Sequence, residues 1–151
     1  SVQGVEPYSV GKLGDIEQVF WPDHCVNGTD GEQWYEGLFA KVNDKVVYKG
    51  QDIEVDSYSG FFDNNKKNKT ALDDILKENN ITDVFVVGLA TDYCVKFTAL
   101  DAVGLGYKTH VVKDCCAGIS PEGIEKAYKE MEKAGIILHD SWDVDWRTQE
   151  V

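Results

Sequence analysis

The sequence lacks any long apolar run, so no transmembrane helix is predicted for its 151 residues. It also lacks a cluster of Lys and Arg, and its net charge is −12 at pH 7. Nucleic acid is therefore excluded as a partner, because phosphate contacts need clustered basic side chains. The first residues contain neither a basic segment nor an apolar one, so a secretory signal peptide is not predicted.

Cysteines are few, and none of them forms a CxxC pair. The four are Cys25, Cys94, Cys115 and Cys116, of which the last two are adjacent and would seldom bridge each other. Without a secretion signal, free thiols in a reducing compartment are the better interpretation. We therefore expect a cytoplasmic protein without disulfides.

Strands that alternate with helices dominate the second half of the chain. A continuous apolar run at 84–87 is typical of a strand buried on both faces of a parallel sheet. Ser120 followed by Pro121 predicts the start of a helix that Gly135 ends. Further helices are expected over 32–39, from Thr70 and over 92–103, and further strands over 45–50, 109–112 and 136–138. A loop is expected over 114–119, and the ends of the chain, 1–20 and 141–151, are expected to be irregular. The pattern predicts one α/β domain with a parallel sheet.

The segment from Gly88 to Cys94 is the most informative one. A buried strand ends there, the chain turns sharply, and a helix begins with Cys94 in its first turn. Unpaired amides and the positive end of the helix dipole stabilise a thiolate and an oxyanion, as a cysteine nucleophile requires. Taken alone, Cys94 is slightly better explained as a small buried residue of a core helix.

Three other segments carry weaker signals. Lys49 ends a predicted strand and could lower the pKa of a nucleophile beside it, but an exposed lysine at a strand end is the commoner case. His24 could bind a metal, although a metal site needs more ligands than one. Trp21 and Tyr58 could flank a planar ligand, or could pack as ordinary aromatic residues. We interpret His110, His139, Cys115 and Cys116 as structural.

Together, these segments resemble the nicotinamidase branch of the isochorismatase-like cysteine hydrolases. The resemblance runs from about residue 21 to about residue 139. It rests on four segments: Trp21-Pro22-Asp23-His24-Cys25, Lys49-Gly50, Asp56-Ser57-Tyr58-Ser59-Gly60-Phe61 and Gly88-Leu89-Ala90-Thr91-Asp92-Tyr93-Cys94. The last segment alone indicates the superfamily, and the first narrows it to nicotinamidases.

The resemblance implies a catalytic role for three residues. Cys94 would be the nucleophile, Lys49 the lysine of a catalytic triad, and the amides of Ala90 and Cys94 the oxyanion hole. The bond from Leu89 to Ala90 would match a cis peptide of the family. The implied reaction converts nicotinamide into nicotinic acid and ammonia through a thioester on Cys94, within NAD salvage.

The resemblance also implies a ring pocket and a metal. Trp21, Tyr58 and Tyr93 would line the pocket, and His24 would be one ligand of a divalent metal. Zinc is the first expectation, with manganese or iron as alternatives. Homo-oligomerisation is left open.

The family pattern is incomplete in this sequence. The family's aspartate base, in a motif like Asp-x-Gln-x-x-Phe, has no counterpart here, nor has the Asp-x-His segment that supplies further metal ligands. The family sheet order resembles 3-2-1-4-5-6, and its first two strands would be missing. We therefore expect a three-layer α/β/α fold of which these residues form the C-terminal part, with little stability alone.

Several explanations stay open for this departure. The chain also lacks a starting Met, so it is expected to begin downstream of the true start, unless Met is simply removed. The missing part could belong to the same polypeptide or to a separate N-terminal fragment. Alternatively, the chain is an inactive truncated product or a non-catalytic binding module of the same fold. A further alternative keeps the amide chemistry on pyrazinamide-like or ureido substrates.

Overall fold

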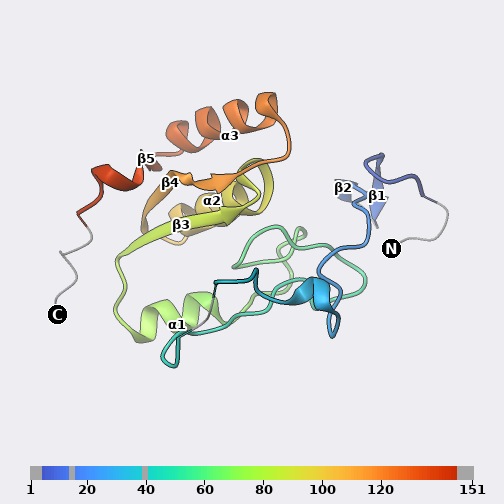
Figure 1. Cartoon of the computed structure of the whole chain (residues 1–151), viewed down its shortest axis with the longest axis horizontal. Coiled ribbons are helices and arrows are strands. Elements are labelled where there is room, and N and C mark those ends of the chain that lie inside the picture. The colour runs from blue at the N-terminus through green and yellow to red at the C-terminus, as the bar shows by residue number, and fades with distance from the viewer. Residues whose placement is uncertain (1–4, 14–15, 39–40, 146–151) are drawn as a thin grey trace. The chain divides into compact units, whose positions relative to one another are not determined.

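The computed structural model describes residues 5–13, 16–38 and 41–145 (Figure 1). The chain divides into two compact units, Ser1–Val46 and Val47–Val151, which are described separately below. In the described part of the chain, no helix is long and apolar enough to cross a membrane. All four cysteines are free, as predicted from the sequence.

The first unit contains an antiparallel hairpin and one short 3₁₀ helix. Strand β1 (Val10–Leu13) pairs with β2 (Ile16–Val19), and the backbone N–H of Phe20 extends the ladder by donating to the oxygen of Ser9 at 2.9 Å. The 3₁₀ helix η1 covers Asp30–Glu32.

Two sequence-based expectations for the first unit are therefore wrong. Residues 1–20 are not irregular throughout, because the paired strands of the hairpin occupy 10–13 and 16–19. Its strands are too short, polar and interrupted by glycine to show an alternating pattern. The helix expected over 32–39 is reduced to η1 within the described residues, and residue 39 lies outside them.

The second unit is built on a parallel sheet of three strands in the order β3-β4-β5. Strand β3 (Asp83–Leu89) pairs with β4 (Lys108–Ala117), which pairs with β5 (Ile137–His139). The helices are α1 (Leu72–Glu78), α2 (Lys96–Gly104) and α3 (Pro121–Lys133), with the π-helical turn η2 (Thr91–Val95) before α2 and a 3₁₀ helix η3 (Ser141–Asp143) at the end. The α/β class and the parallel sheet are confirmed.

The core joins α2 and α3 to the sheet. Val111 of β4 lies in one buried cluster with Ala99 of α2 and with Ala127 and Met131 of α3, all of them fully buried. Complete burial of a side chain such as Met131 contributes about 1.5–3 kcal/mol. A second cluster connects α1 to the start of β4 through Phe61 and Tyr107. These clusters hold the strand ends and the helix starts that form the candidate site.

Three boundaries in the second unit differ from the sequence-based expectation. No strand forms over 45–50, because no neighbouring strand in the described residues pairs with it. Strand β4 continues to Ala117, through most of the expected loop over 114–119, because Cys116 and Ala117 still pair with β3 beyond a register shift at Gly88. The helix expected from residue 92 begins as η2 and becomes α-helical only at Lys96.

Candidate active site

The turn after β3 places Cys94 at the carboxyl end of the sheet. The Leu89–Ala90 peptide bond is cis, as the family resemblance implies. The carbonyl oxygen of Ala90 accepts hydrogen bonds from the amides of Tyr93 and Val95, each at 3.0 Å, which closes the turn. Cys94 is half-buried there, directly before α2. This is the strand–turn–helix setting in which a cysteine can act as a nucleophile.

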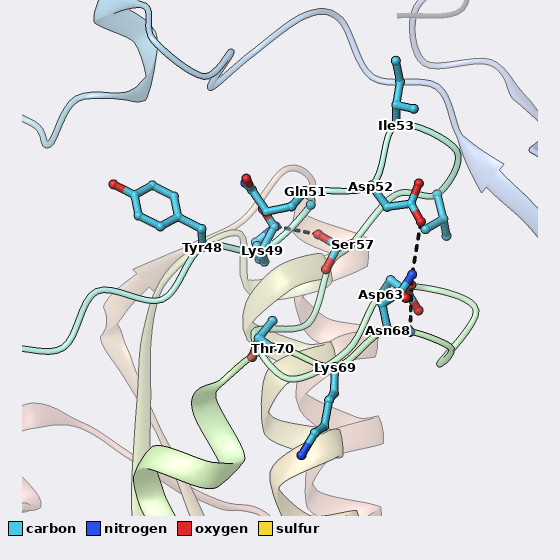
Figure 2. A pocket seen from close by; sticks show the side chains of 12 residues that line it. Tyr48, Lys49, Gln51, Asp52, Ile53, Ser57, Asp63, Asn68, Lys69 and Thr70 are labelled. Atoms are coloured by element: carbon cyan, nitrogen blue, oxygen red, sulfur yellow. Dashed lines mark hydrogen bonds between the residues drawn. The ribbon is translucent and has the colours of Figure 1, made fainter.

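Lys49 lies in an extended segment of the same unit. Its Nζ donates a hydrogen bond to the carbonyl oxygen of Ser57 at 2.5 Å. Figure 2 shows this bond at the wall of a cavity of about 500 Å³, which is lined by residues 48–53, 55, 57, 63 and 68–70. Cys94 is not among the described residues that line this cavity, so the cavity itself does not unite Lys49 with the expected nucleophile.

Tyr58 and Tyr93, both predicted to line a ring pocket, are brought together in the second unit. Their ring centroids lie 5.5 Å apart in an edge-to-face arrangement. Phe97 of α2 stacks on Tyr58 at 5.4 Å, so three aromatic rings adjoin the Cys94 turn. Such a group offers apolar faces to a planar aromatic ligand.

Two threonines fix the segment that carries Tyr58. The backbone N–H of Gly60 donates to Oγ1 of Thr98 on α2 at 2.9 Å, and Oγ1 of Thr70 donates to the carbonyl oxygen of Gly60 at 2.6 Å. The second of these bonds ties the segment to the start of α1, where Oγ1 of Thr70 also accepts from the amide of Leu72 at 3.1 Å. The aromatic group is therefore anchored to two helices.

Trp21 and His24 belong to the first unit. Trp21 is half-buried, with its ring edge-to-face against Tyr8 at 5.9 Å. His24 is exposed, and its Nδ1 lies 2.7 Å from the carbonyl oxygen of Pro22. Because a carbonyl only accepts, Nδ1 carries the proton, which leaves the lone pair on Nε2.

The described residues do not fit a complete metal site. Across residues 5–13, 16–38 and 41–145, no group of three or more His, Cys, Asp or Glu side chains is placed to hold an ion. His24 therefore stays a single candidate ligand, and one imidazole does not hold zinc with useful affinity.

Cys116 and Cys115 lie in β4 and differ in burial. The thiol of Cys116 donates to the carbonyl oxygen of Val112 at 3.2 Å, and burial raises the pKa of this thiol. A thiol with a raised pKa is a poor nucleophile at neutral pH. Cys115 is exposed in β4.

Two residues of the site were missed from the sequence. Phe97 follows Tyr93 by four positions, and this helical spacing could have indicated a common face. Asp92 is buried and accepts hydrogen bonds from a segment 27 and 28 residues further along the chain. No local pattern in the sequence indicates that long-range contact.

The comparisons with known proteins give a consistent result. The model of the isochorismatase domain matches residues 8–142. The nicotinamidase of Escherichia coli (strain K12) is 48% identical over 148 residues, which cover 97% of this chain and 68% of that protein.

Solved structures agree with the sequence comparison. A nicotinamidase pyrazinamidase of Acinetobacter baumanii superposes with a TM-score of 0.89 at 38% identity, over 94% of this chain and 69% of the other. The pyrazinamidase of Pyrococcus horikoshii in complex with zinc superposes with a TM-score of 0.72 at 34% identity, over 80% of this chain and 63% of the other. The chain therefore belongs to the isochorismatase family, as its resemblance to the nicotinamidase branch predicts.

Proposed function

We propose that this chain carries the nucleophilic cysteine of a nicotinamide amidohydrolase. The single observation that carries the proposal is the position of Cys94, half-buried in the turn that follows the cis peptide bond from Leu89 to Ala90. The 48% identity to the nicotinamidase of E. coli supports nicotinamide as the substrate. Such an activity would serve NAD salvage.

The proposed reaction is a covalent hydrolysis in two steps. The thiolate of Cys94 attacks the carboxamide carbon, the carbon–nitrogen bond breaks, and ammonia leaves with a proton taken from the medium. Water then attacks the thioester, which releases nicotinic acid and restores the thiol. The amides of Ala90 and Cys94 are the proposed donors to the oxyanion in both steps.

The other site residues receive roles that follow from their chemistry. The ammonium of Lys49 would favour the anionic form of a nucleophile beside it. Tyr58 and Tyr93 would hold the pyridine ring, supported by their edge-to-face contact. Trp21, in the first unit, stays a proposed substrate-binding residue. The zinc complex of the P. horikoshii relative supports a divalent metal, with Nε2 of His24 as one ligand.

The test is ammonia release from nicotinamide by the wild type and by Cys94→Ser. We expect the substitution to lower kcat by roughly 10³-fold or more, because a serine without a strong base is a weak nucleophile. Cys115→Ser is the matched control, since Cys115 is also a free thiol but is exposed in β4. This variant should retain the wild-type rate. Unchanged turnover by Cys94→Ser would exclude Cys94 as the nucleophile.

A non-catalytic binding module of the same fold is the second candidate. It stays the alternative to catalysis because the sequence has no counterpart of the family's aspartate base. The same assay separates the two candidates. Saturable binding of nicotinamide by the wild type, measured by calorimetry, without any release of ammonia would support the binding module.

Substrate choice is tested with ring analogues. We expect pyrazinamide to react, because the related structure from A. baumanii is named a pyrazinamidase as well as a nicotinamidase. Benzamide, which has the same carboxamide without a ring nitrogen, should react with a roughly 5- to 100-fold lower kcat/KM, since an unpaired polar partner in the site costs about 1–3 kcal/mol. Equal rates on benzamide would show that the ring nitrogen is not recognised.

A further inference from the structure

Asp92 is a buried carboxylate in the same turn as Cys94, two residues before it. Only 6% of the residue is exposed. Its Oδ1 accepts a hydrogen bond from the amide of Ile119 at 3.0 Å, and its Oδ2 accepts from the amide of Ser120 at 3.2 Å. The carboxylate therefore joins the Cys94 turn to the segment that leads into α3.

The space around this carboxylate depends on two glycines. A Cβ at Gly123 would lie 2.6 Å from Oδ2 of Asp92, and a Cβ at Gly118 would lie 3.0 Å from Oδ1 and 2.4 Å from a side-chain carbon of Ile124. Real Cβ atoms do not approach neighbours this closely. The start of α3 is thus shaped to admit the Asp92 side chain.

The chemistry of the contact explains why an anion can be buried there. Burial of a carboxylate is costly unless hydrogen bonds replace its water. The amides of Ile119 and Ser120 lie at the N-terminus of α3, a helix of 13 residues, where the dipole also favours negative charge. Charge-assisted hydrogen bonds of this kind are stronger and more directional than neutral ones.

We propose that Asp92 is a positioning residue for Cys94. Its carboxylate fixes the Cys94 turn against the start of α3, so that the sulfur is held where it can attack the carboxamide. This inference rests on the proposed amidohydrolase function. The effect passes from Asp92 to Cys94 through the short backbone turn that the carbonyl oxygen of Ala90 closes.

The first test compares Asp92→Asn with Ser120→Ala. Asparagine has the same shape, but one of its terminal atoms is a donor that faces amide donors, so the contact with residues 119 and 120 is weakened. Ser120→Ala removes the helix cap, in which Oγ accepts from the amide of Gly123 at 3.0 Å, and leaves the amides that bind Asp92 in place. Both variants lower the stability of the start of α3, but only Asp92→Asn weakens the contact that holds the Cys94 turn against it.

The readouts are kcat and KM, together with the rate at which iodoacetamide alkylates the Cys94 peptide, followed by mass spectrometry. All are measured well below the melting temperature of each variant. We expect Asp92→Asn to lower kcat by roughly 10- to 100-fold with KM within about twofold, since a misplacement of about 1 Å can cost that much. Its alkylation rate should differ from that of the wild type at least about threefold, whereas Ser120→Ala should keep the wild-type kcat and alkylation rate.

Gly123→Ala disturbs the same contact from its α3 side. It is the decisive variant if Asp92→Asn does not fold. The new methyl group would lie 2.6 Å from Oδ2 of Asp92 and 2.7 Å from Oγ of Ser120, so it would displace both. Ser120→Ala shows the effect of losing the cap alone, so the further loss of kcat expected of Gly123→Ala reports the displaced carboxylate, although alanine favours the helix. The inference would be overturned if Asp92→Asn kept the wild-type kcat and alkylation rate, or if Ser120→Ala lost as much kcat as Asp92→Asn. If the wild type releases no ammonia, the proposed function fails, and the alkylation rates still test Asp92 because they need no substrate.

Discussion

At the scale of single residues, His110 occupies an unusual position in β4. Its Nδ1 lies 2.8 Å from Nε2 of His139, its Nε2 lies 3.5 Å from Oδ1 of Asp83, and its ring stacks on Phe85 at 4.3 Å. Burial lowers the pKa of His110, and the neighbouring His139 and Lys108 act in the same direction, against the opposing effect of Asp83. The folded protein therefore favours the neutral imidazole.

This burial predicts a loss of stability in mild acid. In the unfolded chain, His110 takes up a proton near pH 6.5, whereas in the folded chain it does so only at a lower pH. The unfolded state binds more protons in that window, so the free energy of unfolding falls as the pH falls. We expect His110→Gln to have a smaller drop in Tm between about pH 7.5 and 5.5 than the wild type.

The exposed His24 provides the control for this experiment. His24→Gln removes an imidazole that is not buried, so its Tm should follow the wild-type pH dependence. A His110→Gln protein whose Tm falls as steeply as that of the wild type would contradict the prediction. The measurement is differential scanning calorimetry in matched buffers.

At the scale of elements, sequence patterns predicted those that depend on local signals. Helix α3 is confirmed, and Ser120 caps it through its Oγ. Strand β3 is confirmed as a strand, but its expected burial on both faces is wrong, because β3 lies at the edge of the described sheet and Val87 is 52% exposed. The strand expected over 45–50 is wrong, since a strand also needs a partner and the pattern of one segment contains no information on pairing. The site shows the same difference between local and long-range features. The Cys94 turn was predicted from its local sequence, whereas its contact with α3 was not.

Tyr107, directly before β4, links the start of that strand to α1. Its hydroxyl donates to Oδ1 of Asp73 at 2.8 Å, and burial together with this hydrogen bond raises the pKa of Tyr107 to about 12. Because an unfolded tyrosine ionises near pH 10, the folded state loses relative stability as the pH rises from about 10 to 12. At neutral pH the bond is fully formed.

We expect Tyr107→Phe to lower the free energy of unfolding at pH 7 by about 1 kcal/mol, the usual contribution of one hydrogen bond. Urea denaturation followed by fluorescence measures this change. Absorbance at 295 nm should also show that the tyrosine that ionises last in the wild type is missing from the variant. Tyr35→Phe is the control, because Tyr35 is 81% exposed, and its denaturation curve should match the wild type. An unchanged midpoint in Tyr107→Phe would mean that the Asp73 contact contributes nothing.

At the scale of the whole molecule, the fully buried side chains of the described residues all lie in the second unit. Every buried side chain in the described part of the chain lies between Val55 and Ile136, and none lies among the described residues of Ser1–Val46. The chain spans 68% of the length of the E. coli nicotinamidase, and the expectation that a base and further metal ligands lie upstream stays a prediction. A sequence comparison of four motifs could identify the family, but it could not indicate how burial is distributed.

This distribution predicts where a protease cuts first. A bond must open locally before it is cleaved, and segments with few buried contacts open at low free energy. Lys41 and Lys45 are exposed and lie in the unit without buried residues, whereas Lys126 lies on α3, whose Ala127 and Met131 are fully buried. Limited trypsin digestion should therefore cut after Lys41 or Lys45 before it cuts within 83–139.

Mass spectrometry of a digestion time course gives the order of cleavage. The expected early product begins at residue 42 or 46 and contains the intact sheet with α2 and α3. Digestion of the urea-unfolded chain is the control, since all lysines are then equally open and no order should remain. Early cleavage after Lys108 or Lys126 in the native chain would mean that β4 and α3 open as readily as the first unit. The buried clusters around Val111 would then not be the most stable part of the molecule.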